Sequence, residues 1–120
     1  MASGKTISRN RFFDHADGPA TIAAKASGTK FAISAFLDLE LEDVKNFSGD
    51  KLLSDEGVSA TIVESGTHVL EFIVAFKSTA SSCTIECSFT ANDGAKQQRT
   101  STVSGAVNDI ARVSFHAPVE

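Results

Sequence analysis

Two polar side chains near the C-terminus have the types and the spacing that nucleophilic catalysis uses. Ser114 and His116 alternate with Val113 and Phe115, so on an extended strand they lie side by side on one face. A histidine beside a serine can remove the hydroxyl proton in acyl transfer. The sequence offers neither an orienting carboxylate nor an oxyanion hole for this pair. We therefore expect that the protein is not an enzyme, and keep a small serine hydrolase as the second alternative.

Acidic side chains form the second set of chemical groups. Asp38, Glu40 and Glu42 alternate with leucines and would share one strand face at about 7 Å spacing. Asp14 and Asp17 flank a histidine just before a turn-forming Gly-Pro pair. Carboxylates that converge with loop carbonyls can bind Ca²⁺, but no calcium-loop motif is present. We expect no metal and no cofactor, and keep a calcium-assisted or carbohydrate-binding module as the first alternative function.

The two cysteines predict buried thiols rather than a disulfide. Cys83 and Cys87 alternate with polar residues and share a face with Ile85 and Phe89. In a regular strand their Cα atoms are about 13 Å apart, roughly twice the separation that a disulfide allows. Both are therefore expected to be reduced and to pack as small apolar residues.

The elements that must position these groups are strands. In Lys30–Glu42 apolar residues occupy alternate positions, which places one stripe in a core and the other mostly in water. Six further runs, of which Thr21–Ala26 is a weak signal and Gln97–Ser104 is more polar, are interpreted as short strands separated by turn residues, with loops at Asn46–Lys51 and Ser54–Gly57. The seven predicted strands are Thr21–Ala26, Lys30–Glu42, Val58–Glu64, His68–Lys77, Cys83–Thr90, Gln97–Ser104 and Ile110–Ala117, the last ending at Pro118.

This pattern predicts an all-β fold: a single-domain antiparallel β-sandwich over residues 1–120, with a small barrel as the alternative. Residues 1–18 are expected to form an N-terminal arm that the pattern leaves irregular. The phenylalanines on core-facing positions should be buried. They are Phe31, Phe72, Phe76, Phe89 and Phe115.

One predicted strand is apolar on both faces. Its core stripe consists of Leu70, Phe72, Val74 and Phe76. On the opposite face, Val69 and Ile73 are also apolar, so that face is either covered by the same chain or in contact with another one. The sequence does not decide between cover by the same chain and contact with another chain. The second supplies the leading hypothesis, a non-enzymatic module that binds a protein partner or itself through Val69 and Ile73.

Composition excludes several classes of partner. The formal net charge of −4 and the absence of large basic clusters argue against nucleic acid. The small clusters Lys5, Arg9, Arg11 and Lys96, Arg99 are interpreted as solvated surface. No apolar run is long enough to span a bilayer, so we expect no membrane partner either. The first residues lack the apolar region of a signal peptide, which predicts a cytoplasmic or otherwise leaderless protein unless a leader has been removed.

The segment Thr29–Phe36 resembles an early strand of the small bacterial calcium-dependent lectins, which are β-sandwiches. That resemblance covers only this segment and implies an Asp/Asn-rich calcium loop near the C-terminus. The corresponding part of this chain holds Asn108, Asp109 and then His116–Glu120. Because the residues that would hold calcium and sugar are replaced, the family is not assigned.

Overall fold

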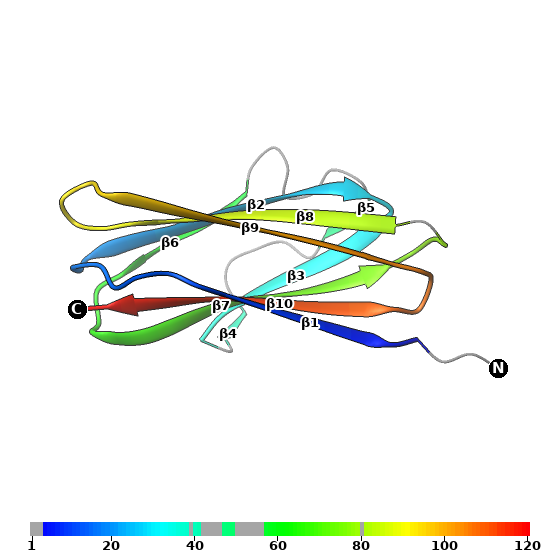
Figure 1. The fold of residues 1–120 in the computed structure, drawn as a ribbon, viewed down its shortest axis with the longest axis horizontal. Helices are drawn as coiled ribbons and strands as arrows, with labels where there is room; N and C mark the ends of the chain where they lie inside the picture. The colour runs from blue at the N-terminus through cyan, green and yellow to red at the C-terminus, as the bar shows by residue number, and fades with distance from the viewer. Residues whose placement is uncertain (1–3, 39, 42–46, 50–56, 80) are drawn as a thin grey trace.

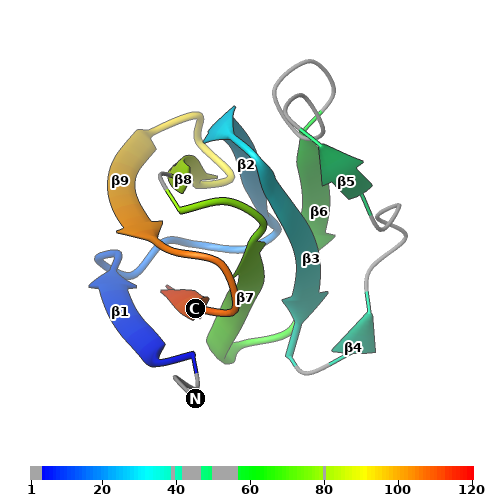
Figure 2. The ribbon, with the colours of Figure 1, turned by 90° about the vertical axis from the view of Figure 1, so that its right-hand side faces the viewer.

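The computed structural model describes residues 4–38, 40–41, 47–49, 57–79 and 81–120. The strands of this part form two sheets that pack face to face, as Figures 1 and 2 show. The predicted all-β sandwich is therefore confirmed, and the two sheets do not join into the barrel that was the alternative. Among these residues, no helix is long and apolar enough to cross a membrane.

Ten strands make up the described fold. They are β1 (Thr6–Phe12), β2 (Ala20–Thr29), β3 (Phe31–Leu37), β4 (Glu40–Leu41), β5 (Phe47–Gly49), β6 (Val58–Ile62), β7 (Gly66–Phe76), β8 (Ser81–Thr90), β9 (Lys96–Gly105) and β10 (Ile110–Val119). The first sheet has the order β1-β10-β7-β3-β4, and the short strand β5 also pairs with β3. The second sheet has the order β6-β2-β8-β9.

The core lies between the two sheets and follows the predicted alternation. All five phenylalanines expected there are at most 3% exposed, and the Phe72 and Phe115 rings meet edge to face with centroids 6.0 Å apart. Cys83 and Cys87 point into this core as free thiols that are fully buried, as predicted. Burial raises the pKa of each thiol to about 12, because a thiolate would lose its hydration there.

The predicted strand Lys30–Glu42 is wrong in its second half. The backbone of Asp38 has a φ of 52°, a left-handed conformation that Asp adopts more readily than most residues. The chain reverses at this point, so that Leu37 pairs with Glu40 in a short antiparallel hairpin. Asp38 and Glu40 therefore do not lie along one strand face, and Glu42 lies outside the described residues.

Three further expectations need correction. The N-terminal arm contains a regular strand, because β1 pairs over its whole length with β10. That pairing is parallel, whereas every other pairing of the described strands is antiparallel. The predicted loop Asn46–Lys51 includes the short strand β5, and β10 continues through Pro118 to Val119.

A buried carboxylate holds the beginning of β1 in place. Asp109, in the turn before β10, accepts hydrogen bonds from the backbone N–H groups of Lys5 (3.0 Å) and Ala106 (2.9 Å). These bonds favour the ionised form and hold the pKa of Asp109 below its ordinary value. A Cβ atom at Gly4 would overlap the carbonyl oxygen of Asn108, so this approach requires glycine. The β1 strand is thus fixed by its pairing with β10 and by the Asp109 carboxylate, and not by an apolar side-chain stripe of its own.

Candidate functional site

The outer face of the first sheet carries the residues that the sequence singled out on β7. Val69 and Ile73 are both half-buried there, and Glu71 lies between them. Phe36 of β3 is directly opposite Glu71 in the register, which places its ring diagonally next to both Val69 and Ile73. We call Phe36, Val69 and Ile73 the outer patch. The described strands all belong to the two sheets, and the second sheet packs on the opposite face.

A fixed ion pair borders this patch. The Arg112 side chain of β10 contacts both carboxylate oxygens of Glu71, at 3.0 and 3.3 Å. Ser114 is buried beside them and donates to the same carboxylate at 3.4 Å. These polar groups therefore satisfy one another. The apolar groups of this face are the outer patch and the exposed Phe12 ring, which stacks on His116 next to Val69.

Ser114 and His116 lie on the same face of β10, but their hydrogen bonds go to different partners. Ser114 donates to Glu71, whereas Nε2 of His116 bonds Oδ1 of Asn10 at 3.0 Å. The imidazole ring also stacks on Phe12, with centroids 4.5 Å apart. A general base must reach the hydroxyl that it deprotonates, and within the described part of the chain no hydrogen bond joins this serine to this histidine. The hydrolase hypothesis gains no support from this geometry.

The Asp38 carboxylate connects the turn after β3 to the first half of β7. Its Oδ1 accepts from the Val69 N–H at 2.9 Å, and its Oδ2 is 2.7 Å from Nδ1 of His68. The other ring nitrogen, Nε2, is 2.9 Å from the carbonyl oxygen of Glu64. Both nitrogens face acceptors, and both can donate only when the ring is protonated. Burial lowers the pKa of His68, but the bonds to Asp38 and Glu64 outweigh it, so the net shift is upward.

The remaining acidic candidates do not join Asp38. Asp14 exchanges backbone hydrogen bonds with the Gln97 side chain, at 2.7 and 2.8 Å, and the Asp17 carbonyl accepts from the Asn92 N–H at 3.0 Å. Within the described ranges, no group of three or more His, Cys, Asp or Glu side chains could hold a metal ion. The calcium hypothesis therefore rests on the sequence pattern alone.

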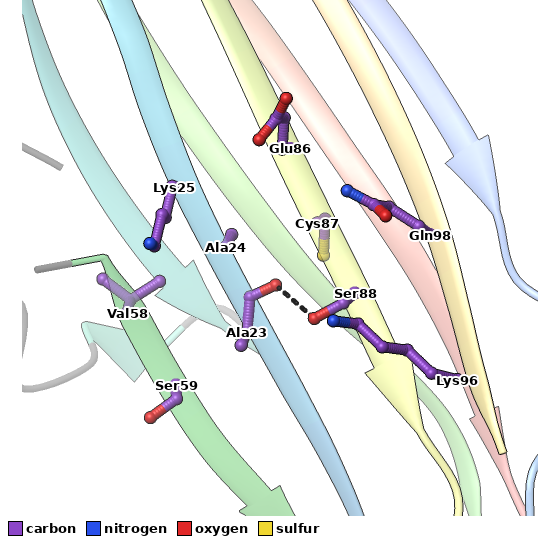
Figure 3. A pocket seen from close by; sticks show the side chains of 10 residues that line it. All are labelled: Ala23, Ala24, Lys25, Val58, Ser59, Glu86, Cys87, Ser88, Lys96 and Gln98. Carbon is purple, nitrogen blue, oxygen red and sulfur yellow. Dashed lines mark hydrogen bonds between the residues drawn. The ribbon is translucent and has the colours of Figure 1, made fainter. Parts of the chain in front are cut away.

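A shallow polar hollow lies on the outer face of the second sheet (Figure 3). Its volume is about 280 Å³, and the ionic side chains around it are Lys25, Glu86 and Lys96. Ser88 donates to the Ala23 carbonyl at its floor. No aromatic ring lines the hollow, so it lacks the flat apolar surface on which a sugar ring would stack. The hollow therefore adds no support to the carbohydrate alternative.

A second recess was not predicted from the sequence. It has a volume of about 210 Å³ and lies where β1 and β9 run side by side, at one open side of the sandwich (Figure 1). Its lining residues are Asn10, Arg11, Phe12 and Arg99. From the sequence alone, Arg11 and Arg99 belong to two separate clusters that are interpreted as solvated surface. Packing of one sheet on the other brings these arginines to one place, which no local pattern could indicate.

Comparison with known proteins adds no relative: no protein-family model, no curated protein and no solved structure matches this chain.

Proposed function

We propose that this chain is a non-enzymatic binding module that associates with a second copy of itself through the outer patch. The observation that carries the proposal is the contiguous apolar surface of Phe36, Val69 and Ile73 on a sheet face that no other described strand covers. These three residues are only partly exposed, but they form a group rather than lying singly, which is typical of association surfaces.

The charges next to the patch favour a second copy as the partner. Arg112 and Glu71 lie together on this face, and the Arg112 side chain is 51% exposed. In a two-fold arrangement each copy presents the same surface to the other. A guanidinium of one copy can then approach the carboxylate of its partner, so that positive and negative groups oppose each other across the contact.

The size of the face sets the expected strength. Three strands at about 4.8 Å spacing and seven residues at about 3.4 Å each give a projected area of roughly 350 Å². A stable interface buries about 800 Å² on each partner. We therefore expect a reversible equilibrium between monomer and dimer that depends on concentration, and not a permanent dimer.

Light scattering after size-exclusion chromatography tests the proposal over loading concentrations from about 10 µM to 1 mM. The native chain should rise from its mass of 12.6 kDa toward twice that value. Ile73→Lys should remain monomeric at every concentration, because it places an unpaired charge within the patch.

Thr100→Lys is the matched control. It makes the same change in net charge at an exposed position of β9, in the second sheet, and should associate as the native chain does. A native chain that stays monomeric throughout would contradict the proposal. Equal loss of association in both variants would do so too, since it would reflect net charge and not the patch.

A further inference from the structure

Positive charge gathers along one side of the sandwich. Of the four arginines in the chain, Arg9 and Arg11 lie on β1 and Arg99 lies on the neighbouring β9. The fourth, Arg112, is paired with Glu71 on the outer face of the first sheet. The chain as a whole has a formal net charge of −4, so this concentration of guanidinium groups runs against its composition.

The recess between β1 and β9 contains two of these groups and no acidic residue. Arg11, Arg99, Asn10 and Phe12 line it, and no Asp or Glu of the described chain is among the lining residues. The two guanidinium charges are therefore not compensated by a carboxylate within the recess. Two like charges that line the same recess repel each other, and an anion bound between them would relieve that repulsion.

Arg99 is held rigidly in this position. Its Nε donates to the Phe12 carbonyl at 3.1 Å, and its Nη1 donates to the Gln98 carbonyl at 2.9 Å. Its guanidinium carbon also lies 5.3 Å from the centroid of the Phe13 ring, within the range of a cation–π interaction. A guanidinium group has five N–H donors, so three remain after these two bonds. Their direction is set before a ligand arrives, which lowers the entropic cost of binding.

The other lining groups also offer donors. Arg11 is exposed and donates to no described residue. The Asn10 side chain bonds His116 on the outer face of the first sheet, which is the face opposite to Arg11, so its amide is not among these donors. The Phe13 N–H points to β10, so by strand alternation the Phe12 N–H points to the open side of β1, where its carbonyl meets Arg99. The donors of Arg11 and Arg99 and the Phe12 N–H therefore border the recess.

An aromatic surface borders the donors. The Phe12 side chain is 64% exposed, and its stacking on His116 fixes the orientation of the ring. The ring lies on the face of β1 opposite to Arg11, so the organic part of a ligand held by the arginines reaches the ring over the open edge of the strand. A simple inorganic ion would leave the ring unused.

We propose that the recess between β1 and β9 binds the phosphate or sulfate group of an ester ligand, with Arg11 and Arg99 on the oxyanion and Phe12 against the organic part. A tetrahedral oxyanion presents at least three acceptor oxygens to donors from different directions, and guanidinium groups match such oxygens with paired hydrogen bonds. Phe12 shares the outer face of the first sheet with the outer patch, whereas Arg11 and Arg99 do not, so the arginine variants test this inference separately from the self-association proposed above.

Titration of the ¹⁵N-labelled protein with phenyl phosphate, inorganic phosphate, inorganic sulfate and acetate, followed by NMR, tests the site. Phosphate and sulfate should shift the signals of residues 10–12 and 97–99, with dissociation constants of about millimolar. Phenyl phosphate should bind more tightly, and Phe12→Ala should remove that advantage. A preference for phosphate or for sulfate would identify the source of the group. Acetate binding as tightly as phosphate, or shifts confined to other residues, would overturn the assignment.

Two arginine variants separate a specific site from general attraction of anions. Arg11→Gln should weaken the binding of phenyl phosphate at least about tenfold, because it removes charged hydrogen bonds to the ligand. Arg9→Gln makes the same change in net charge on the same strand but lies outside the recess, and should change the affinity by less than about twofold. Equal effects of the two substitutions would contradict the proposal, since they would show that only net charge matters.

Discussion

Phe12, the last residue of β1, and Phe13, which follows it, point to opposite sides of the chain and test how the end of the N-terminal strand is anchored in the core. Phe13 is 5% exposed and packs between Phe89 and Phe115, with ring centroids 5.3 and 6.3 Å away. Replacing a buried phenylalanine by alanine costs about 3–5 kcal/mol in the free energy of unfolding. Loss of the Arg99 cation–π contact adds about 0.5–1 kcal/mol.

Phe12→Ala is the matched comparison. The Phe12 ring is 64% exposed and contacts a partly exposed histidine, so its removal should cost below about 1 kcal/mol. The free energies of unfolding of the two variants should therefore differ by at least about 2 kcal/mol. Urea denaturation followed by far-ultraviolet circular dichroism measures this difference, because the chain has no Trp or Tyr to report by fluorescence.

Phe13→Leu keeps the comparison usable if the alanine variant does not fold, since it should cost below about 1.5 kcal/mol. A loss of less than about 1 kcal/mol for Phe13→Ala, or equal losses for the alanine variants at both positions, would refute the packing described for β1.

Three further predictions concern single groups. Burial lowers the pKa of His68, but its bonds to Asp38 and Glu64 raise it above 6.5 in the folded state, so the stability that these bonds add is fully present below pH 6.5 and is lost as the pH rises through the folded-state pKa. The free energy of unfolding should fall by about 0.5–1 kcal/mol over that range. Asp38→Asn should reduce this dependence, with the bond to the Glu64 carbonyl retained, which denaturation at pH 6 and pH 8 measures. Cys83 and Cys87 are fully buried with pKa values of about 12, so a thiol reagent followed by absorbance should modify both only after denaturation, and rapid reaction of the native protein would contradict their burial. Ser114 donates to Glu71 and has no histidine base within hydrogen-bond reach among the described residues, so a serine-directed phosphonate should leave the mass of the protein unchanged; labelling of Ser114 would restore the hydrolase hypothesis.

The fold could be predicted from the sequence because most strands bury one face. Alternation of apolar and polar residues located β3, β7 and β8, and it correctly placed Cys83 and Cys87 in the core. The β1 strand gave no such signal, since all of its residues except Ile7 are exposed. It is held by pairing with β10 and by the Asp109 carboxylate, and neither produces a periodic pattern.

The failure at Asp38 has a related cause. The apolar alternation continues through Leu39 and Leu41 after the chain has reversed, so periodicity alone cannot distinguish a tight hairpin from one long strand. The left-handed φ of Asp38 is what turns the chain into a hairpin at this position. A single Asp in an apolar run is only a weak sequence signal of such a conformation.

Of the surfaces considered for function, the sequence could indicate only one that lies within a single strand. Val69 and Ile73 are four residues apart on β7, so they share one face of the strand, and their outward placement follows from strand geometry. Phe36 joins them only through the pairing of β3 with β7. Arg11 and Arg99 meet only because the two sheets pack together, a relation between residues far apart in the chain that no spacing encodes.

Contacts between copies of the chain provide the most direct test of self-association through the outer patch. In a sample that mixes chains carrying ¹³C-labelled methyl groups with unlabelled chains, isotope-filtered NMR detects only contacts between different molecules. Self-association through the outer patch predicts such contacts at the methyl groups of Val69 and Ile73, with the ring of Phe36 from the other chain among their partners. Intermolecular contacts that arise only elsewhere, or none at concentrations of about 1 mM, would contradict the assignment of the outer patch as the surface of self-association.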